Sequence, residues 1–566
     1  MTFAALAALM GAAASAASEA DIAAFREARF GMFIHWGLYS QLGGRYKGQT
    51  MPYIGEWAQS YFRIPSAEYA EFAKDFNPTK FDADDWARQA KAAGMEYVIL
   101  TTKHHDGFSM YATKVTPYNI VDATPFGRDA FGELAAACRR QGLKVGLYYS
   151  QALDWHEFDA ADPAGKNPTR RSSLANSGGM PWGNSWDWPD ASKKDISRYL
   201  KAKVYPQLRE LLTNYGEIFV IWFDTPFCLT PEMSRDLREY VRSLQPRTLV
   251  NSRIGNGLGD FGSMGDNQML TGKSEMPVES PATLNDTWGF KYDDHRWKSG
   301  YEIACWLMQA ISCNANYLLN IGPRPDGRFP DASSDVLAEL AAWRQKTGVK
   351  IRGAGPSPFA QAMPWGWCTT APGNVLQLII RSDWTNDLEV SGIRNNVRAC
   401  SCPFEKTSST LLIRPPEKED SMPRVVRVEL EGTPDVDQRL MPQCGELILH
   451  PVASCRLLTG TDNGKGVAAA KAEAPLVGKK CRITEQGGLT DWHHEGDGIV
   501  WTVCFPLPGR YRVWLQTETW GHSEKWDGSG RRVEVCVGKS RVEGVLKKDR
   551  VLPKTVYERM ESGLGV

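Results

Sequence analysis

The stretch EIFVIWFD at residues 217–224 places a carboxylate, Asp224, directly after six bulky apolar residues. A run of this kind is typical of a strand that is buried on both faces, as in a parallel sheet. Thr225 and Pro226 follow and end the strand. In barrels of alternating strands and helices, the carboxyl ends of the strands carry the catalytic residues. Asp224 is therefore a candidate catalytic residue, and the alternative is an Asp that only caps the following turn.

Strand and helix patterns alternate on both sides of this stretch, from about residue 22 to residue 350. Further strands are expected at 30–36, 97–102, 144–150, 248–253 and 317–321. Helices are expected at 81–93, 129–141, 204–214, 231–244 and 301–312. This alternation predicts a (β/α)8-type, TIM-like barrel over residues 21–350. Residues 150–188 and 259–285 lack the pattern, and we expect them to form long loops over the barrel mouth.

After about residue 352 the sequence changes to short segments of alternating polarity. These segments predict one or two C-terminal β-sandwich domains, at 351–460 and, as a second β-rich domain, at 470–566. Aromatic residues are frequent in the second domain, which suggests a carbohydrate-binding module, because aromatic faces stack on sugar rings. A structural sandwich with tryptophans in its core is the alternative. The residues concerned are Trp501, Trp514, Trp520, His522 and Trp526.

The composition bears on partners and on the cellular compartment. Lys+Arg and Asp+Glu both number 66, so nothing points to nucleic acid or to an anionic membrane as a partner. Residues 3–18 are apolar and end in small residues, which predicts that 1–20 is a secretory signal or an Ala-rich tail. We therefore expect a periplasmic or secreted protein. Eight of the twelve cysteines follow residue 350, so C-terminal disulfides are possible.

Polar side chains end several of the expected strands. If the barrel forms, these residues lie at one mouth, as the parts of an active site do. The sequence has no Cys-x-x-Cys pair, no His-Glu-x-x-His motif, no Gly-x-Ser-x-Gly elbow and no phosphate loop. We therefore expect no metal and no cofactor. A carboxylate among neutral donors and aromatics suits a polyhydroxylated ligand. The strand-end residues are His35, His104, His105, Tyr149, Asp224 and Arg253.

Several runs of the sequence follow one another in the order of a known family. They are RFGMFIHWG at 29–37, GEW at 55–57, TKHHDGF at 102–108, WFD at 222–224, NSR at 251–253, TWGF at 287–290 and LLNIGP at 318–323. With these runs, the sequence resembles the α-L-fucosidases of glycoside hydrolase family 29. The resemblance covers residues 25–350, in the family's order. It implies a retaining enzyme that releases terminal α-linked L-fucose from fucosylated oligosaccharides or glycoconjugates through a covalent glycosyl-enzyme.

The resemblance also implies a role for each matched residue. Asp224 matches the nucleophile, and Glu279 matches the acid/base, with Glu275 as the alternative. Trp288 would face the methyl group of fucose, which requires an apolar wall. The residues that would hold the hydroxyls and the ring are His35, Glu56, Trp57, His104, His105, Tyr149, Trp222 and Arg253.

Two other interpretations remain open at this point. One is a fucose-binding protein that has lost catalysis, which a turnover assay separates from an enzyme. The other is a barrel glycosidase that acts on a related sugar. It depends on whether the wall at Trp288 leaves room for a hydroxyl where fucose has a methyl group.

Overall fold

The computed structural model divides into two compact units, residues 1–502 and 503–566. It describes residues 17–163, 179–417 and 421–451, followed by shorter segments. These segments are 455–458, 482–483, 489–490, 497–505, 508–518, 530–552 and 559–566.

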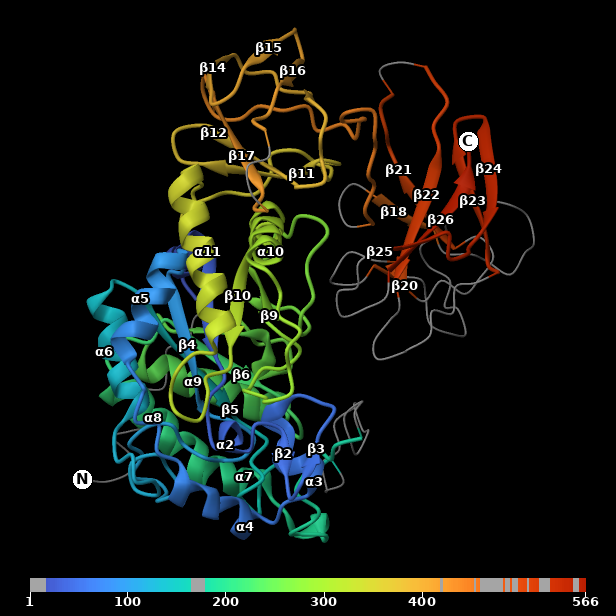
Figure 1. The fold of residues 1–566 in the computed structure, drawn as a ribbon. Helices are drawn as coiled ribbons and strands as arrows, with labels where there is room; N and C mark the ends of the chain where they lie inside the picture. The colour runs from blue at the N-terminus through green and yellow to red at the C-terminus, as the bar shows by residue number, and fades with distance from the viewer. Residues whose placement is uncertain are drawn as a thin grey trace, which may run out of the picture. The chain divides into compact units, whose positions relative to one another are not determined.

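Eight parallel strands of the described chain form a curved sheet in the first unit (Figure 1). Neighbouring strands follow one another in the sequence, and β1 pairs with β10. The two edge strands, β7 and β8, are joined by a parallel bridge between Asn251 and Phe261, so the sheet closes on itself. The expected TIM-like barrel is confirmed. Its strands are β1 (Phe30–Ile34), β4 (Tyr97–Lys103), β5 (Lys144–Ser150), β6 (Val220–Asp224), β7 (Leu249–Val250), β8 (Gly262–Ser263), β9 (Val278–Thr283) and β10 (Ala315–Ile321).

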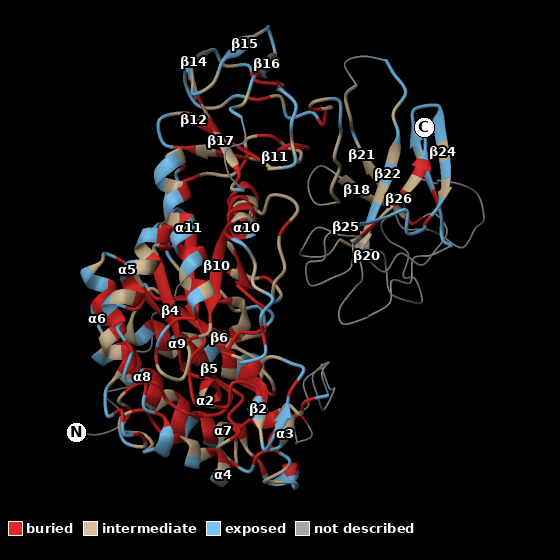
Figure 2. Cartoon of the chain, in the orientation of Figure 1, coloured by how far each residue is buried: buried red, intermediate tan, exposed pale blue. Residues whose placement is uncertain are grey.

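Helices surround this barrel and begin at capping residues. Asp82, Asp129, Thr230 and Ser299 each accept a hydrogen bond from a first-turn amide, which satisfies a donor that the helix itself leaves free. Figure 2 shows the long barrel strands mostly buried and the outer helix faces exposed. The helices are α1 (Glu19–Ala28), α5 (Ala83–Ala93), α6 (Ala130–Arg140), α8 (Tyr205–Asn214), α9 (Pro231–Leu244), α10 (Gly300–Ser312) and α11 (Asp331–Thr347).

Short elements fill the connections near the barrel mouth. Between β1 and β4 these are α2 (Tyr39–Leu42), β2 (Arg45–Tyr46), β3 (Gln49–Thr50), η3 (Gly55–Trp57), α3 (Ala58–Phe62), α4 (Ser66–Glu71) and η4 (Phe72–Asp75). Between β5 and α8 they are η5 (Ala191–Lys193), α7 (Ile196–Tyr199) and the π-helix η6 (Leu200–Val204), and η7 (Ser252–Ile254) follows β7.

Residues 259–285, which we expected to form a loop, contain the strands β8 and β9. This expectation was wrong because β9 reads Val-Glu-Ser-Pro-Ala-Thr and has no apolar run. Proline also argues against a central strand. However, the ladder between β8 and β9 covers only Val278 and Glu279. Beyond it, Pro281 takes part through its carbonyl oxygen, which accepts a hydrogen bond from the Asn267 amide at 3.0 Å, so the N–H that proline lacks is not needed there.

The barrel interior is a packed core and not a pore. Phe25 of α1 lies at the amino-terminal end of the barrel, where its ring centroid is 4.3 Å from that of Phe261 and 6.4 Å from that of Tyr97. Phe33 and Trp222 belong to the same buried cluster, with centroids 5.0 Å apart. Aromatic side chains therefore fill the barrel beneath the mouth at the carboxyl ends of the strands.

A β-sandwich follows the barrel, as expected for the region after residue 350. One sheet has the order β11-β12-β17-β14 and the other β13-β16-β15. Leu376, Leu378 and Ile380 of β12 face the sandwich core, whereas Ile379 packs on the barrel core. The strands are β11 (Gly366–Ala371), β12 (Val375–Ile380), β13 (Leu388–Ser391), β14 (Val397–Cys400), β15 (Phe404–Lys406), β16 (Thr410–Ile413) and β17 (Arg424–Leu430).

The remaining strands pair antiparallel. In the first unit they are β18 (Cys455–Leu458), β19 (Arg482–Ile483), β20 (Leu489–Thr490) and β21 (Gly498–Trp501), and in the second β22 (Val513–Glu518), β23 (Arg532–Val537), β24 (Ser540–Val545), β25 (Arg550–Leu552) and β26 (Arg559–Gly565). Trp501 ends β21 and Trp514, which is 48% exposed, lies on β22. Trp520, His522 and Trp526 lie outside the described residues.

The described residues bear on disulfides and on membrane-spanning helices. The cysteines of the described segments are all free, so these segments contain none of the disulfides considered possible. No helix in the described part of the chain is long and apolar enough to span a bilayer.

Candidate active site

Asp224 is the last residue of β6, at the carboxyl end of the barrel. Its Oδ2 accepts a hydrogen bond of 3.0 Å from the Tyr148 hydroxyl, and its Oδ1 accepts one of 2.9 Å from Arg253. Burial alone would raise the pKa of Asp224, but Arg253, His105 and Tyr148 together hold this pKa below its ordinary value. The carboxylate is therefore held ionised and oriented at neutral pH.

Three histidines line the same mouth. The His105 ring contacts Asp224, with Nε2 3.8 Å from Oδ2, and its Nδ1 bonds Ser150 at 2.8 Å. The Nδ1 of His35 bonds Asn320 at 2.7 Å. The Nδ1 of His104 is buried and has no hydrogen-bond partner among the described residues.

Burial sets the protonation of these histidines. It lowers the pKa of His35 to about 3 and that of His105 to about 4, and the pKa of His104 also falls well below its ordinary value. All three are neutral at pH 7, so each ring can both donate and accept a hydrogen bond. Neutral rings of this kind suit hydroxyl groups.

The expectation for Tyr149 was wrong by one residue. Its hydroxyl donates to Gln207 at 2.7 Å, on the face of β5 that packs against the helices. Tyr148 instead faces the interior, where it pairs with Trp222 of β6 and stacks on His104 at 5.3 Å. Successive side chains of a strand point to opposite faces, and both faces of β5 are apolar. The sequence pattern therefore gave no means of choosing between the two tyrosines.

Arg253 links Asp224 to a second carboxylate that the sequence analysis did not select. Its Nη1 donates to Asp224 at 2.9 Å, while its Nη2 donates to Asp266 at 2.5 Å. Asp266 follows β8, and its side chain is 51% exposed. The two carboxylates therefore share one guanidinium. Asp266 belongs to a Gly-Asp-Asn-Gln turn, and only its place beyond a strand could have drawn attention to it.

The two glutamates expected as acid/base candidates lie elsewhere. Glu279 is fully buried in the barrel interior, where Tyr97 donates to its Oε1 at 2.5 Å and Trp222 to its Oε2 at 2.9 Å. Glu275 precedes β9, and its carbonyl oxygen accepts a hydrogen bond from Arg26 of α1 at the opposite end of the barrel. The structure therefore does not bring Glu275 to the mouth, and it leaves Glu279 without access to solvent.

Glu56 and Trp57 of η3 are both brought to the mouth. The Trp57 ring packs edge-on against His105 at 5.3 Å. The Oε2 of Glu56 accepts a hydrogen bond of 2.8 Å from the amide of Gly289. Burial raises the pKa of Glu56 to about 7, which the Gly289 amide opposes.

Trp288 lies beside His35, with ring centroids 5.2 Å apart. The loop that carries it passes over Gly322, which directly follows β10. A Cβ on Gly322 would lie 2.6 Å from the carbonyl oxygen of Trp288. A glycine is therefore required there to let the Trp288 loop approach the mouth.

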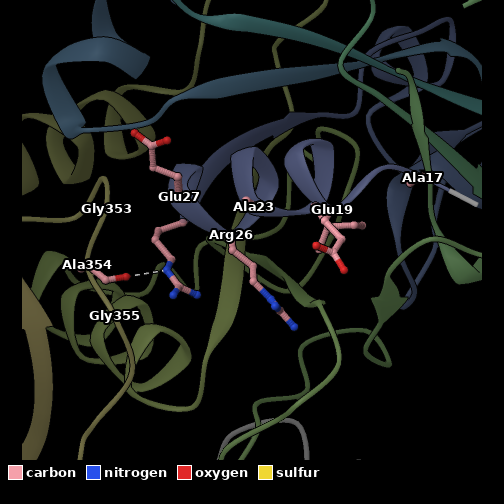
Figure 3. A pocket seen from close by; sticks show the side chains of 10 residues that line it. Ala17, Glu19, Ala23, Arg26, Glu27, Gly353, Ala354 and Gly355 are labelled. Carbon is pink, nitrogen blue, oxygen red and sulfur yellow. Dashed lines mark hydrogen bonds between the residues drawn. The ribbon is translucent and has the colours of Figure 1, made fainter. Parts of the chain in front are cut away.

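A second hollow lies at the amino-terminal end of the barrel, away from Asp224. It lies between α1 and the linker Gly353–Gly355, and Figure 3 shows Glu19, Arg26 and Ala354 around it. The Arg29 guanidinium donates to the Ala354 carbonyl at 2.6 Å. This end holds no paired catalytic carboxylates among its lining residues. Across the described part of the chain, no cluster of His, Cys, Asp and Glu could hold a metal ion.

Similarity to known proteins identifies the family of this chain. Residues 11–349 match the alpha-L-fucosidase family. The chain belongs to this family. It is therefore a glycoside hydrolase, and the retaining α-L-fucosidase activity that the sequence predicts is confirmed at the level of the family.

Several alpha-L-fucosidases are similar to this chain in sequence. The tissue alpha-L-fucosidase of Homo sapiens is 29% identical over 354 residues, which cover 59% of this chain and 69% of the human protein. A putative alpha-L-fucosidase of Caenorhabditis elegans is 28% identical over 353 residues, with 59% and 67% covered.

Solved structures of alpha-L-fucosidases extend the similarity to the fold. The enzyme from Vibrio sp. strain EJY3 is 28% identical with a TM-score of 0.78, and 97% of this chain and 92% of that chain are covered. AlfC from Lactobacillus casei, solved with alpha-L-fucose product, is 43% identical with a TM-score of 0.53. It covers 58% of this chain and 100% of its own.

Proposed function

We propose that this alpha-L-fucosidase uses Asp224 as its nucleophile and Asp266 as its general acid and base. The observation that carries the proposal is the Arg253 guanidinium, which bonds both carboxylates. Retaining glycosidases place their two carboxyl groups about 5–5.5 Å apart, a separation that one shared guanidinium can span. Asp266 is also open to solvent, whereas both oxygens of Glu279 already accept bonds inside the barrel.

The reaction proceeds in two displacements. A carboxylate oxygen of Asp224 attacks the anomeric carbon while Asp266 gives its proton to the leaving glycosidic oxygen, so the C–O bond breaks and a fucosyl ester forms. Asp266 then takes a proton from water, whose oxygen attacks the same carbon and releases Asp224. Two inversions leave the α configuration unchanged.

The other mouth residues would bind the sugar. His35, His104 and His105 are neutral, and the unpartnered Nδ1 of His104 offers a buried site for a hydroxyl. Trp288 would cover the methyl group, because its ring offers no donor on its face. Terminal fucose of glycans is the substrate class that this set of donors and walls favours. Export to the periplasm or beyond, as the sequence predicts, would bring the enzyme to such glycans.

Azide rescue tests both catalytic assignments. With an aryl fucoside, Asp224→Ala should lose at least about 10³-fold in kcat, and azide should restore turnover as the β-fucosyl azide, because it enters from the vacated face. Asp266→Ala should be rescued as the α-fucosyl azide, because azide there attacks the glycosyl-enzyme. Normal turnover by Asp224→Ala would overturn the nucleophile, and a β product from Asp266→Ala would overturn the acid/base.

Leaving groups give an independent test of the acid. Asp266→Ala should lose about 10²–10⁴-fold on a glycan, but far less on 4-nitrophenyl fucoside, whose leaving group requires little protonation. Fuca(1,6)GlcNAc, found in complex with an AlfC mutant, is a suitable glycan probe. If Glu279→Gln showed this dependence and Asp266→Ala did not, Glu279 would be the acid.

A further inference from the structure

Glu279 is a buried acid for which the two displacements give no role. Its side chain has no solvent exposure, and both of its oxygens accept hydrogen bonds, from Tyr97 and from Trp222. Burying a carboxylate is costly unless it makes specific interactions, so its two partners are the place to seek its role.

Trp222 is the partner that leads to the catalytic centre. It precedes Asp224 by two residues on β6, so both side chains point to the same face of the strand. The indole N–H is a donor only and bonds Oε2 of Glu279 at 2.9 Å. Glu279 therefore fixes the rotation of the indole ring in the barrel.

The indole ring in turn contacts both groups that hold the nucleophile. The Arg253 guanidinium lies over it, 4.6 Å from the ring centroid. Tyr148 stacks on it at 5.7 Å with an interplanar angle of 19°. Arg253 and Tyr148 are the two side chains that donate to Asp224.

We propose that Glu279 is a positioning residue that acts on the reaction through Trp222. By holding the indole ring, it sets the planes of Tyr148 and Arg253 and thereby the orientation of the Asp224 carboxylate. The inference rests on the proposed role of Asp224. It adds that a residue inside the barrel, Glu279, orients the side chains that hold Asp224.

A double-mutant cycle with Trp222 is the decisive experiment, measured with an aryl fucoside on full-length protein. Glu279→Leu should lower kcat about tenfold and change KM less than twofold, because the defect lies in the orientation of the nucleophile. In a Trp222→Phe background, Glu279→Leu should cost no more than a further twofold, because the indole N–H is already absent. A full tenfold loss in both backgrounds would overturn the proposal.

The conservative variant covers the case in which Glu279→Leu does not fold. Glu279→Gln keeps an oxygen for Trp222 and gains an N–H for the Tyr97 oxygen, so kcat should stay within threefold of the original. A Gln variant as inactive as Asp224→Ala would overturn the proposal, since it would make Glu279 a group that acts on the substrate itself.

Two controls separate this inference from the others. Asp260→Asn removes another buried carboxylate, which bonds Arg242 and the amide of Val250. It should lower the melting temperature without changing kcat. Asp224→Ala is assayed in parallel. If that variant retains turnover, the proposed function fails. If it is inactive and the Glu279 cycle is additive, only the positioning role fails.

Discussion

The hydroxyl of Tyr148 lies 3.0 Å from Oδ2 of Asp224 and donates a hydrogen bond to it. The hydrogen bond comes from the neighbouring strand β5, in which Ser150 pairs directly with Asp224. It has two effects on the proposed nucleophile. It fixes one carboxylate oxygen in space, and it stabilises the ionised form, which the proposed attack on the sugar requires.

Removing this hydroxyl should therefore change both rate and pH profile. Tyr148→Phe is expected to lower kcat/KM about 10- to 100-fold, since a hydrogen bond to a charged group contributes about 1.5–3 kcal/mol. The pKa of Asp224 lies below its ordinary value, in part because of this bond. Its loss raises that pKa, so the acid limb of the kcat/KM profile should move to higher pH.

Tyr149→Phe is the matched control for this variant. It removes the same atom from the next residue, where the hydroxyl bonds Gln207 outside the mouth. Here we expect an unchanged pH profile and a modest fall in melting temperature. If both variants shifted the acid limb equally, the assignment of Tyr148 to the nucleophile would be wrong.

Gly322→Ala tests whether the Trp288 loop forms the wall for the methyl group. The added Cβ would lie 2.6 Å from the Trp288 carbonyl oxygen and would push the loop away. We expect a higher KM for fucosides, measured by steady-state kinetics, and little change in melting temperature, measured by calorimetry. The same variant with unaltered KM would indicate that the loop does not contact the sugar.

Trp288→Ala should relax the choice of sugar at C6. In place of the methyl group of fucose, L-galactose carries a hydroxymethyl group, which needs more space. The ratio of kcat/KM for aryl α-L-fucoside over the L-galactoside should fall about tenfold, which is typical for one small group in an apolar pocket. A ratio that stays constant would place the methyl group against another wall.

The buried Lys103, Asp154 and Lys203 network should carry much of the stability of the loop at the mouth. Asp154 lies 3.3 Å from the Lys103 ammonium and 2.9 Å from that of Lys203, without solvent exposure. Burial opposes ionisation, yet the two lysines lower the pKa of Asp154 to about 2. Its contribution to stability is thus fully present above the ordinary pKa of 3.8 and is lost as the pH falls through about 2.

Asp154→Asn would leave the two ammonium groups buried without their counter-charge. At pH 7 we expect a loss of about 3–5 kcal/mol and a melting temperature lower by about 10 °C. Asp84→Asn, which breaks an exposed pair with Arg140, should shift it by about 1 °C. Calorimetry gives the melting temperature of each variant. Equal decreases in the two variants would contradict the stabilising role given to the buried network.

Five of the six predicted barrel strands have five to seven residues and are rich in apolar side chains, whereas β7 has two and was predicted from its place after a helix. The strands β8 and β9 could not be predicted, since β8 consists of Gly and Ser and β9 contains Glu, Ser and Pro. Their stability comes from pairing with neighbours that are distant in sequence. The spacing of apolar residues along the sequence, which indicates helices and strands, cannot reveal such pairing.

The candidate site shows the same division. Asp224 and the histidines end apolar runs and were predicted from that position. Asp266 sits in a polar turn, and only the fold brings it to Arg253. Glu279 stood beside a family motif, but the fold turns it into the barrel, where Trp222 and Tyr97 meet it. The neighbours in the folded chain therefore decide which carboxylate lies beside Arg253 and which lies inside the barrel.

The single bridge between Asn251 and Phe261 gives the barrel a seam. In the fully described stretch 251–277, the chain has no α-helix and only one strand, the two-residue β8. Few hydrogen bonds of regular secondary structure therefore restrain this stretch. Arg253 and Asp266 stand on the two sides of this seam. Insertions or deletions between them would reshape the entrance for the leaving group while the long strands keep Asp224 in place. Selectivity for different glycans can thus diversify without risk to the fold.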